Sequence, residues 1–237
     1  MSPILSVQNL SSGYGSQLVL RDLSLEVEEG TLTGLVGTNG HGKTTLLRTI
    51  SGLIRTRAGE IHASGSRLDR LRADEIVGLG IVQVPQGDLL FPDMTVRENL
   101  MMGAYLPKAA AGSRQQLEEV FTLLPKLRDR QAQVAGTLSG GERRMVGIGR
   151  GLMADARLLM LDEPSLGLAP IIIDQIYEVI QSLTKAGKTL VVVEENALRI
   201  ADLADRVHLL DNGNFVWSGT GAEFLSSTEI LSSYLGG

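Results

Sequence analysis

The sequence predicts an α/β fold, because short apolar runs alternate with helical segments along the chain. Residues 32–36 form one such run, which is followed by a glycine-rich turn and a helix at 45–50. Residues 158–161 form a second run, which ends in two acids. Residues 189–193 form a third, ahead of a helix at 197–204. Runs of this length are typical of strands buried within an α/β sheet.

The turn after the first of these strands fits the pattern G-x-x-x-x-G-K followed by Ser or Thr, which is the phosphate-binding loop (P-loop) of nucleoside triphosphatases. Its glycines let backbone amides point at a phosphate, and the helix N-terminus adds partial positive charge. Lys43 is expected to reach the β- and γ-phosphates, and the Thr44 hydroxyl to bind Mg²⁺. We expect the His41 side chain to face solvent. The predicted nucleotide-binding residues are Gly37, Thr38, Asn39, Gly40, His41, Gly42, Lys43, Thr44 and Thr45.

A pair of acids marks a second part of the predicted site. Asp162 and Glu163 follow the strand at 158–161, and α/β sheets present ligand groups at the ends of their strands. Asp162 is predicted to hold Mg²⁺, directly or through water, and Glu163 to polarise an attacking water as general base. A plain turn could also carry two acids. Downstream of a phosphate loop, with Pro164 closing the strand, the catalytic interpretation is favoured.

The rest of the chain reads as two further regions of one domain, 1–237. Strands at 4–10, 18–20 and 23–27 predict an antiparallel β subdomain, with a turn at 12–16. Tyr14 in that turn either stacks on an adenine or caps the sheet, and its spacing leaves both open. The capping box at 95–98 opens a helix in an inserted α-helical subdomain, approximately 88–136. Elsewhere we predict strands at 59–63 and 81–86, helices at 73–79, 113–124, 139–152, 170–183 and 229–235, and a hairpin of 207–210 with 214–217.

Composition narrows the possible classes of function. The chain has 237 residues, and its net charge of −5 argues against binding nucleic acid or anionic lipid through charge. There are no cysteines, which excludes disulfides and thiolate metal sites. The N-terminus lacks the pattern of a signal peptide, and no apolar run approaches the length of a membrane span. We therefore expect a soluble chain that reaches a membrane only through a partner.

Several motifs together resemble the ATP-binding subunits of ABC transporters, over essentially the whole chain. The phosphate loop, Gln86, the Leu-Ser-Gly-Gly-Glu signature at 138–142 and the pair of acids stand in the family's order. The signature is the specific element, because a phosphate loop alone fits many NTPases and a serine with two glycines alone fits an ordinary helix cap. Residues 165–170 and 193–197 resemble the subunits of branched-chain amino acid importers.

The resemblance implies a mechanism in which two ATP-binding subunits pair head to tail. ATP then lies between the phosphate loop of one subunit and the signature of the other, where the ligating residues are Ser139, Gly140, Gly141 and Glu142. Gln86 is implied to contact Mg²⁺ and the attacking water, and to link the site to the helical subdomain. The surface of that subdomain near Phe91 and Pro92 is implied to meet the membrane subunits. ATP and Mg²⁺ are the expected cofactors.

The resemblance also implies partners and a location. We expect a second, non-identical ATP-binding subunit, two transmembrane permease subunits and an extracytoplasmic substrate-binding protein. The chain would lie at the cytoplasmic face of the inner membrane, held there by the permease subunits. Nucleic acid is not an expected partner.

One position departs from the family's pattern. ABC subunits usually carry a histidine just after the strand that here ends at Val193, and that histidine contacts the γ-phosphate. Aligning on residues 193–194 puts Glu195 there, a degenerate switch position in the catalytic set. An ionised carboxylate about 4 Å from a phosphate charge is repelled by about 1 kcal/mol in water. Either Glu195 turns away from the nucleotide, or this site hydrolyses ATP poorly.

Two other functions compete with amino acid import. A soluble ABC-type ATPase that acts on DNA or ribosomes usually joins two ATP-binding domains or carries a long coiled-coil insertion, and this chain has neither. The second alternative is a regulatory module that hydrolyses little ATP. Glu163 argues against it because it supplies a general base, and Glu195 argues for it because it replaces the usual histidine. The transported substrate is chosen by other subunits, so import of urea, amides or other amino acids stays open.

Overall fold

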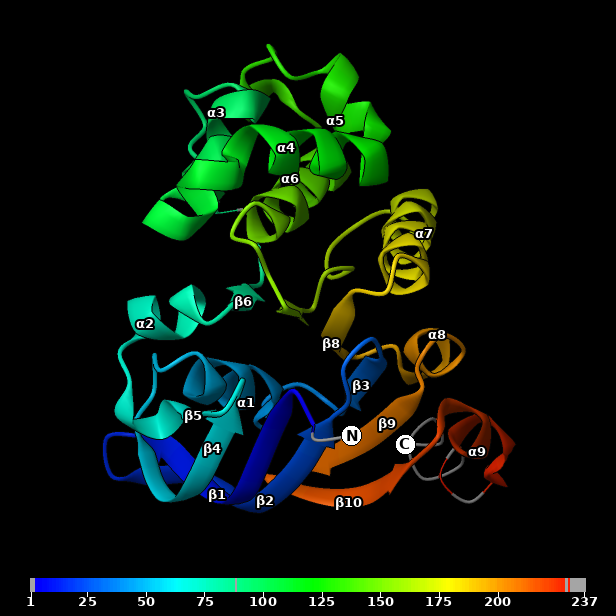
Figure 1. Cartoon of the computed structure of the whole chain (residues 1–237). Helices are drawn as coiled ribbons and strands as arrows, with labels where there is room; N and C mark the ends of the chain where they lie inside the picture. Colours follow the sequence, from blue (N-terminus) through cyan, green and yellow to red (C-terminus); the bar gives the residue numbers. More distant parts are fainter. Residues whose placement is uncertain (1–2, 88, 229, 231–237) are drawn as a thin grey trace. The chain divides into compact units, whose positions relative to one another are not determined.

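The computed structural model describes residues 3–87, 89–228 and 230 (Figure 1). The chain divides into two compact units. One unit is built from Met1–Ala73 and Thr189–Gly237, and the other from Asp74–Lys188. Within the described residues, every helix is too short or too polar to cross a lipid bilayer. The mixture of sheets and helices confirms the predicted α/β class.

The first unit contains a four-stranded antiparallel sheet in the order β2-β1-β4-β5. The strands predicted at 18–20 and 23–27 are confirmed as strand, but they are joined in a single strand over residues 17–27. The reason is a set of register shifts along β1 and β2, with Asp22 at φ 52°, which lets a polar stretch stay within the ladder. The turn predicted at 12–16 shrinks to two residues, and Tyr14 ends a strand instead. The bounds are β1 Leu5–Tyr14, β2 Gln17–Val27, β4 Thr56–Ala63 and β5 Ser66–Arg67.

A second sheet in this unit carries the phosphate loop. β3 pairs in parallel with β8 on one side and β9 on the other, and β9 forms an antiparallel hairpin with β10. Every residue of β3 and β8 is buried, as expected for parallel strands covered on both faces. The strands are β3 Leu32–Val36, β8 Thr189–Glu194, β9 Arg206–Asp211 and β10 Asn214–Gly219.

Short helices connect these strands. α8 ends at Ala201 rather than 204, and α9 was not predicted from the sequence. The helix predicted at 229–235 lies outside the described residues except at position 230. The helices are α1 Lys43–Ile50, the 3₁₀ turn η1 Leu68–Arg70, α8 Ala197–Ala201 and α9 Gly221–Ser226.

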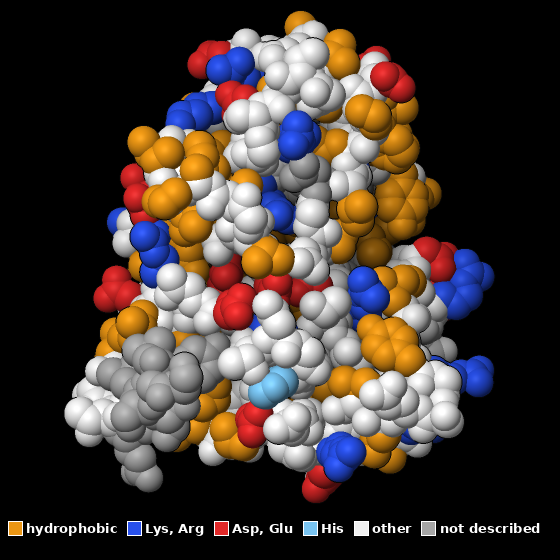
Figure 2. All heavy atoms as spheres, turned by 180° about the vertical axis from the view of Figure 1, so that it is seen from behind, with side chains coloured by type: hydrophobic (Ala, Val, Ile, Leu, Met, Phe, Trp, Pro, Cys, Tyr) orange, Lys and Arg blue, Asp and Glu red, His pale blue; other side chains and the backbone are white. Residues whose placement is uncertain are grey.

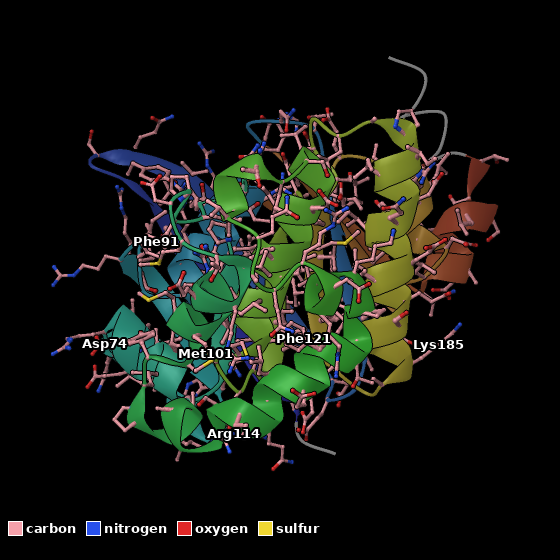
Figure 3. The ribbon with its side chains drawn as sticks, turned by 90° about the horizontal axis from the view of Figure 1, so that it is seen from above. Asp74, Phe91, Met101, Arg114, Phe121 and Lys185 are labelled. Atoms are coloured by element: carbon pink, nitrogen blue, oxygen red, sulfur yellow. The ribbon has the colours of Figure 1, made fainter. Side chains whose placement is uncertain are left out.

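The second unit joins two parallel strands to a group of helices. β6 pairs with β7 so that Val84 lies opposite Leu161. α4 begins at Pro107 rather than 113, because proline at the first position starts a helix without losing a hydrogen bond. Figure 3 looks down on these helices, with Met101 on α3 and Phe121 on α4. The bounds are α2 Ala73–Gly78, β6 Ile81–Val84, α3 Val96–Met101, η2 Met102–Ala104, α4 Pro107–Leu123, α5 Pro125–Asp129, η3 Ala135–Thr137, α6 Gly140–Leu152, β7 Leu158–Asp162 and α7 Pro170–Lys185.

The predicted capping box of α3 is confirmed, with the Thr95 hydroxyl accepting from the Glu98 amide. One residue of α3 shapes the loop ahead of it. Asn99 is fully buried, and its side chain accepts from the Phe91 amide at 2.9 Å and donates to the Phe91 carbonyl at 3.0 Å. The bounds 88–136 of the inserted helical subdomain stay a prediction.

His208 makes the stability of the first unit dependent on pH. Its Nδ1 is 2.7 Å from the Ser218 hydroxyl, and its Nε2 has no hydrogen-bond partner among the described residues. Burial, with a smaller contribution from Arg206, lowers the pKa of His208 to about 4. The unfolded imidazole has a pKa of about 6.5, so acid protonates the unfolded chain first. The free energy of unfolding should therefore fall as pH drops from about 6.5 to 4, by about 3 kcal/mol in all.

Urea unfolding at pH 7 and pH 5 tests this prediction. Between pH 7 and pH 5, the free energy of unfolding of the wild type should fall by about 2 kcal/mol more than that of His208→Gln, because glutamine cannot take up the proton. Half-buried His62, whose Nε2 is 2.9 Å from a Glu60 carboxylate oxygen, is the control when changed to Gln, and its loss of unfolding free energy between pH 7 and pH 5 should be close to that of the wild type. Equal losses in the wild type and His208→Gln would contradict the assignment.

Candidate nucleotide site

The predicted phosphate loop lies between β3 and α1 and has the backbone that a phosphate requires. Gly42 caps α1 in a left-handed conformation, and Gly40 is also left-handed, with φ of 86°. The φ of 107° at Gly42 is a conformation that residues with a Cβ rarely adopt, so glycine is favoured there. The first amides of α1 lack carbonyl partners within the helix, as at any helix N-terminus. Backbone donors are therefore gathered at this turn, as an anion site needs.

Lys43 is folded into this loop. Its ammonium nitrogen donates to the Gly37 carbonyl at 2.6 Å and to the Thr38 carbonyl at 3.2 Å. The side chain is 4% exposed. Thr44 follows it in the first turn of α1 and is half-buried. A buried ammonium, a hydroxyl and a row of amides at one turn fit a polyphosphate with its divalent cation.

The acid after β8 lies beside the phosphate loop. The Asn39 side-chain amide donates to a carboxylate oxygen of Glu195 at 3.2 Å. Both side chains are exposed. Glu195 is thus turned toward the loop, which puts its charge next to the predicted phosphate position.

His41 does not face solvent as predicted. Its Nδ1 lies 2.8 Å from a carboxylate oxygen of Asp211, and its side chain is 27% exposed. The sequence indicated Asp211 only as part of a turn, and no spacing signal connects it to the loop.

Tyr14 is 46% exposed, and its hydroxyl accepts from Arg48 at 3.4 Å. An adenine contact for Tyr14 stays a prediction.

In the second unit, the parallel pairing of β6 and β7 brings Gln86 to Glu163. The Gln86 amide donates to a Glu163 carboxylate oxygen at 3.4 Å. Gln86 is not in the strand predicted at 81–86, because β6 ends at Val84 and the chain turns at proline. Glu163 has φ of 47°, an uncommon conformation for a side chain of this kind. Asp162 and Glu163 are 2% and 5% exposed. Such an acid, aimed by its backbone and contacted by an amide, is well placed to orient a water.

The signature begins α6 with a complete capping box. Ser139 accepts from the Glu142 amide, and the Glu142 carboxylate accepts from the Ser139 amide at 2.9 Å and hydroxyl at 2.8 Å. Burial alone would raise the pKa of Glu142, but the hydrogen bonds from Ser139 and the charge of Arg130 lower it. The Arg130 guanidinium lies 2.8 Å from that carboxylate. Glu142 therefore holds Ser139 in place, a role that sequence reasoning missed.

Two glycines keep this helix end free of side chains. A Cβ on Gly141 would lie 2.2 Å from an Ile172 side-chain carbon, and one on Gly140 would lie 3.5 Å from Leu168. Arg144, buried in α6, donates to the Gly87 carbonyl at 2.9 Å. The segment after β6 is thus tied to the signature helix by a residue that the sequence did not single out.

Surface charge is mixed on the face shown in Figure 2, where acidic and basic side chains are interspersed. A polyanion-binding surface carries clustered Lys and Arg instead. That nucleic acid is not a partner stays a prediction.

The chain is similar to known proteins along its whole length. The family model described as ABC transporter matches residues 20–166. The high-affinity branched-chain amino acid transport ATP-binding protein BraG of Pseudomonas aeruginosa is 44% identical, over 99% of this chain and 100% of that protein. The probable branched-chain amino acid transport ATP-binding protein LivF of Archaeoglobus fulgidus is 35% identical, over 94% of each. A crystal structure of an ATP-binding cassette of an ABC transporter in its ADP conformation superposes with a TM-score of 0.87 at 26% identity, over 100% of each chain.

Proposed function

The chain belongs to the ABC transporter family, and on that premise we propose that it is the ATP-hydrolysing subunit of an importer of branched-chain amino acids. It is an ATPase by its family. The observation that supports the cargo is the full-length identity of 44% to BraG. The alternatives are import of other amino acids, urea or amides, because the membrane and binding subunits choose the substrate.

The proposed residue roles follow from the chemistry of the side chains in each unit. Lys43 and the amides of the phosphate loop bind the phosphates of ATP. Glu163 accepts a proton from the attacking water as the water oxygen bonds to the γ-phosphorus. The bond from that phosphorus to the bridging oxygen breaks at the same step, so that ADP and inorganic phosphate are released. Gln86, 3.4 Å from Glu163, keeps that carboxylate oriented. Thr44 in the first unit and Gln86 and Asp162 in the second are the residues that would hold Mg²⁺, which would supply positive charge against the charge of the phosphates.

The signature acts on ATP held by another subunit. The capping box fixes Ser139 at the start of α6, where helix-end amides can stabilise negative charge on a γ-phosphate. Head-to-tail pairing with a non-identical ATP-binding subunit would supply that phosphate. Two permease subunits and an extracytoplasmic binding protein complete the importer and place this chain at the cytoplasmic face of the inner membrane.

Co-purification tests this assembly. A tagged copy of the chain, expressed with its neighbouring subunits, should recover a second ATP-binding subunit and two permease subunits. A stable transporter with two copies of this chain and no other ATPase would contradict the pairing. Recovery of ribosomes or DNA-binding partners instead of permeases would favour the alternative of a soluble ABC-type ATPase that acts on DNA or ribosomes.

Glu195 should make the two ATP sites of the assembly unequal. Its carboxylate accepts a hydrogen bond from Asn39 and so lies beside the phosphate loop. The family's γ-phosphate contact is missing, and loss of one such contact slows hydrolysis by about tenfold to a thousandfold. We expect Glu195→His to raise single-turnover hydrolysis, or at least not to lower it. Glu195→Gln keeps a side chain long enough to contact Asn39 and removes the negative charge. It should therefore raise the ATP affinity by about fivefold.

Single-turnover hydrolysis with protein in excess measures both variants. Glu29→Gln, an exposed acid on the turn before β3, is the matched control and should match the wild type. A marked fall in both Glu195 variants would show that Glu195 takes an active part in the reaction.

A further inference from the structure

The side chain of His41 joins the phosphate loop to the β9–β10 hairpin. Its Nδ1 is 2.8 Å from the Asp211 carboxylate, and the Thr38 hydroxyl lies 3.0 Å from Nδ1 and 2.9 Å from Nε2. A carboxylate only accepts hydrogen bonds, so Nδ1 donates to Asp211. The Thr38 hydroxyl contacts the imidazole at about the same distance from both ring nitrogens. The imidazole thus connects the end of β9 to the second residue of the loop.

The backbone repeats this connection on both sides of the histidine. The Gly213 amide in the hairpin turn donates to the His41 carbonyl at 3.1 Å. Gly37 lies so close to β9 that a Cβ there would be 2.3 Å from the Leu210 carbonyl oxygen. The hairpin end therefore supports the phosphate loop from its first residue to its fifth.

The same contacts reach the lysine that binds phosphate. The Thr38 carbonyl accepts from the Lys43 ammonium at 3.2 Å, next to the 2.6 Å bond from that ammonium to Gly37. A chain of contacts thus runs from Asp211 through His41 and Thr38 to Lys43. Loss of either end of the His41–Asp211 pair would leave the loop more conformations to lose when ATP binds.

We propose that His41 and Asp211 form a brace that holds the phosphate loop in its ATP-binding shape. Both are positioning residues, because they act on the loop and not on the reacting atoms. The proposal rests on the proposed ATP-binding function and adds a residue pair to it. The brace governs the affinity for ATP, whereas Glu163 governs the chemical step, so the two effects can be separated.

A double-mutant cycle on the full-length chain tests the brace. ATP titration of the wild type, His41→Ala, Asp211→Ala and the double variant gives four dissociation constants. Each single change should weaken ATP binding by about threefold to tenfold, and the double variant should be no weaker than the worse single variant. The single-turnover hydrolysis rate at saturating ATP should fall by a smaller factor than the ATP affinity does in each of the three variants.

Two further variants sharpen the result. Asp211→Asn keeps an acceptor for Nδ1 and should recover part of the lost affinity, and it serves if an alanine variant does not fold. His62→Ala breaks another histidine–carboxylate pair of the described residues, in which His62 on β4 lies 2.9 Å from Glu60, and it should leave ATP affinity unchanged.

Three outcomes would overturn the brace while the wild type binds ATP. The first is wild-type ATP affinity in both single variants. The second is a loss of ATP affinity in the double variant that equals the product of the losses in the two single variants. The third is a lower hydrolysis rate at saturating ATP with unchanged ATP affinity. A wild type that does not bind ATP would instead refute the proposed function, so the two failures are distinguishable.

Discussion

Glu163→Gln is expected to lower the rate of ATP hydrolysis by about a hundredfold to ten-thousandfold while ATP still binds. Glutamine has the same shape but cannot take the proton of the attacking water. The position is demanding, because Glu163 is buried in a left-handed conformation and is contacted by Gln86 at 3.4 Å. An amide there preserves the packing and removes only the base.

Single-turnover hydrolysis measures this loss, and size-exclusion chromatography with ATP measures its consequence. If hydrolysis opens the paired subunits, the variant should accumulate as a closed dimer in the presence of ATP. Glu178→Gln, an exposed acid on α7 in the same unit, is the control and should hydrolyse at the wild-type rate. The test is sharpest in a complex whose other ATP site is inactive. Wild-type hydrolysis by such a complex carrying Glu163→Gln would refute the role of Glu163.

Lys43→Ala should weaken ATP binding by roughly a hundredfold. A hydrogen bond from a charged donor is worth about 1.5–3 kcal/mol, or about tenfold to a hundredfold in affinity. The variant also removes the donor that holds the Gly37 and Thr38 carbonyls, so the loop loses part of its shape. The effect should therefore lie at the upper end of that range.

Isothermal titration with ATP gives the affinity directly. Lys185→Ala, an exposed lysine at the end of α7, should titrate like the wild type. Unchanged affinity in Lys43→Ala would remove the basis for the phosphate-loop assignment.

Local signals in the sequence were enough to predict the elements that carry the site. The strand–turn–helix around the phosphate loop, the capped signature helix and the acids after β7 each depend on residues that are adjacent in sequence. Glycine geometry, a serine cap and an apolar run have the same meaning in most folds. The sequence could therefore predict these parts before any tertiary contact was known.

The errors lie where distant contacts decide the outcome. Asp22 stays within β2 because a bulge against β1 accommodates it, and nothing in residues 17–27 alone shows this. His41 is held by Asp211, and Asn39 by Glu195, from segments far along the chain. One error was avoidable, because the capping box of α9, Thr220 with Glu223, is a local signal that could have been used.

ATP hydrolysis by this chain should drive import of branched-chain amino acids, and uptake by the reconstituted transporter measures that coupling. Vesicles containing the chain with its permease partners should, with ATP and the binding protein, accumulate labelled leucine, and they should fail to do so with Glu163→Gln. Uptake of urea but not leucine would reassign the cargo. Full leucine uptake with Glu163→Gln at every copy of this chain would contradict that coupling.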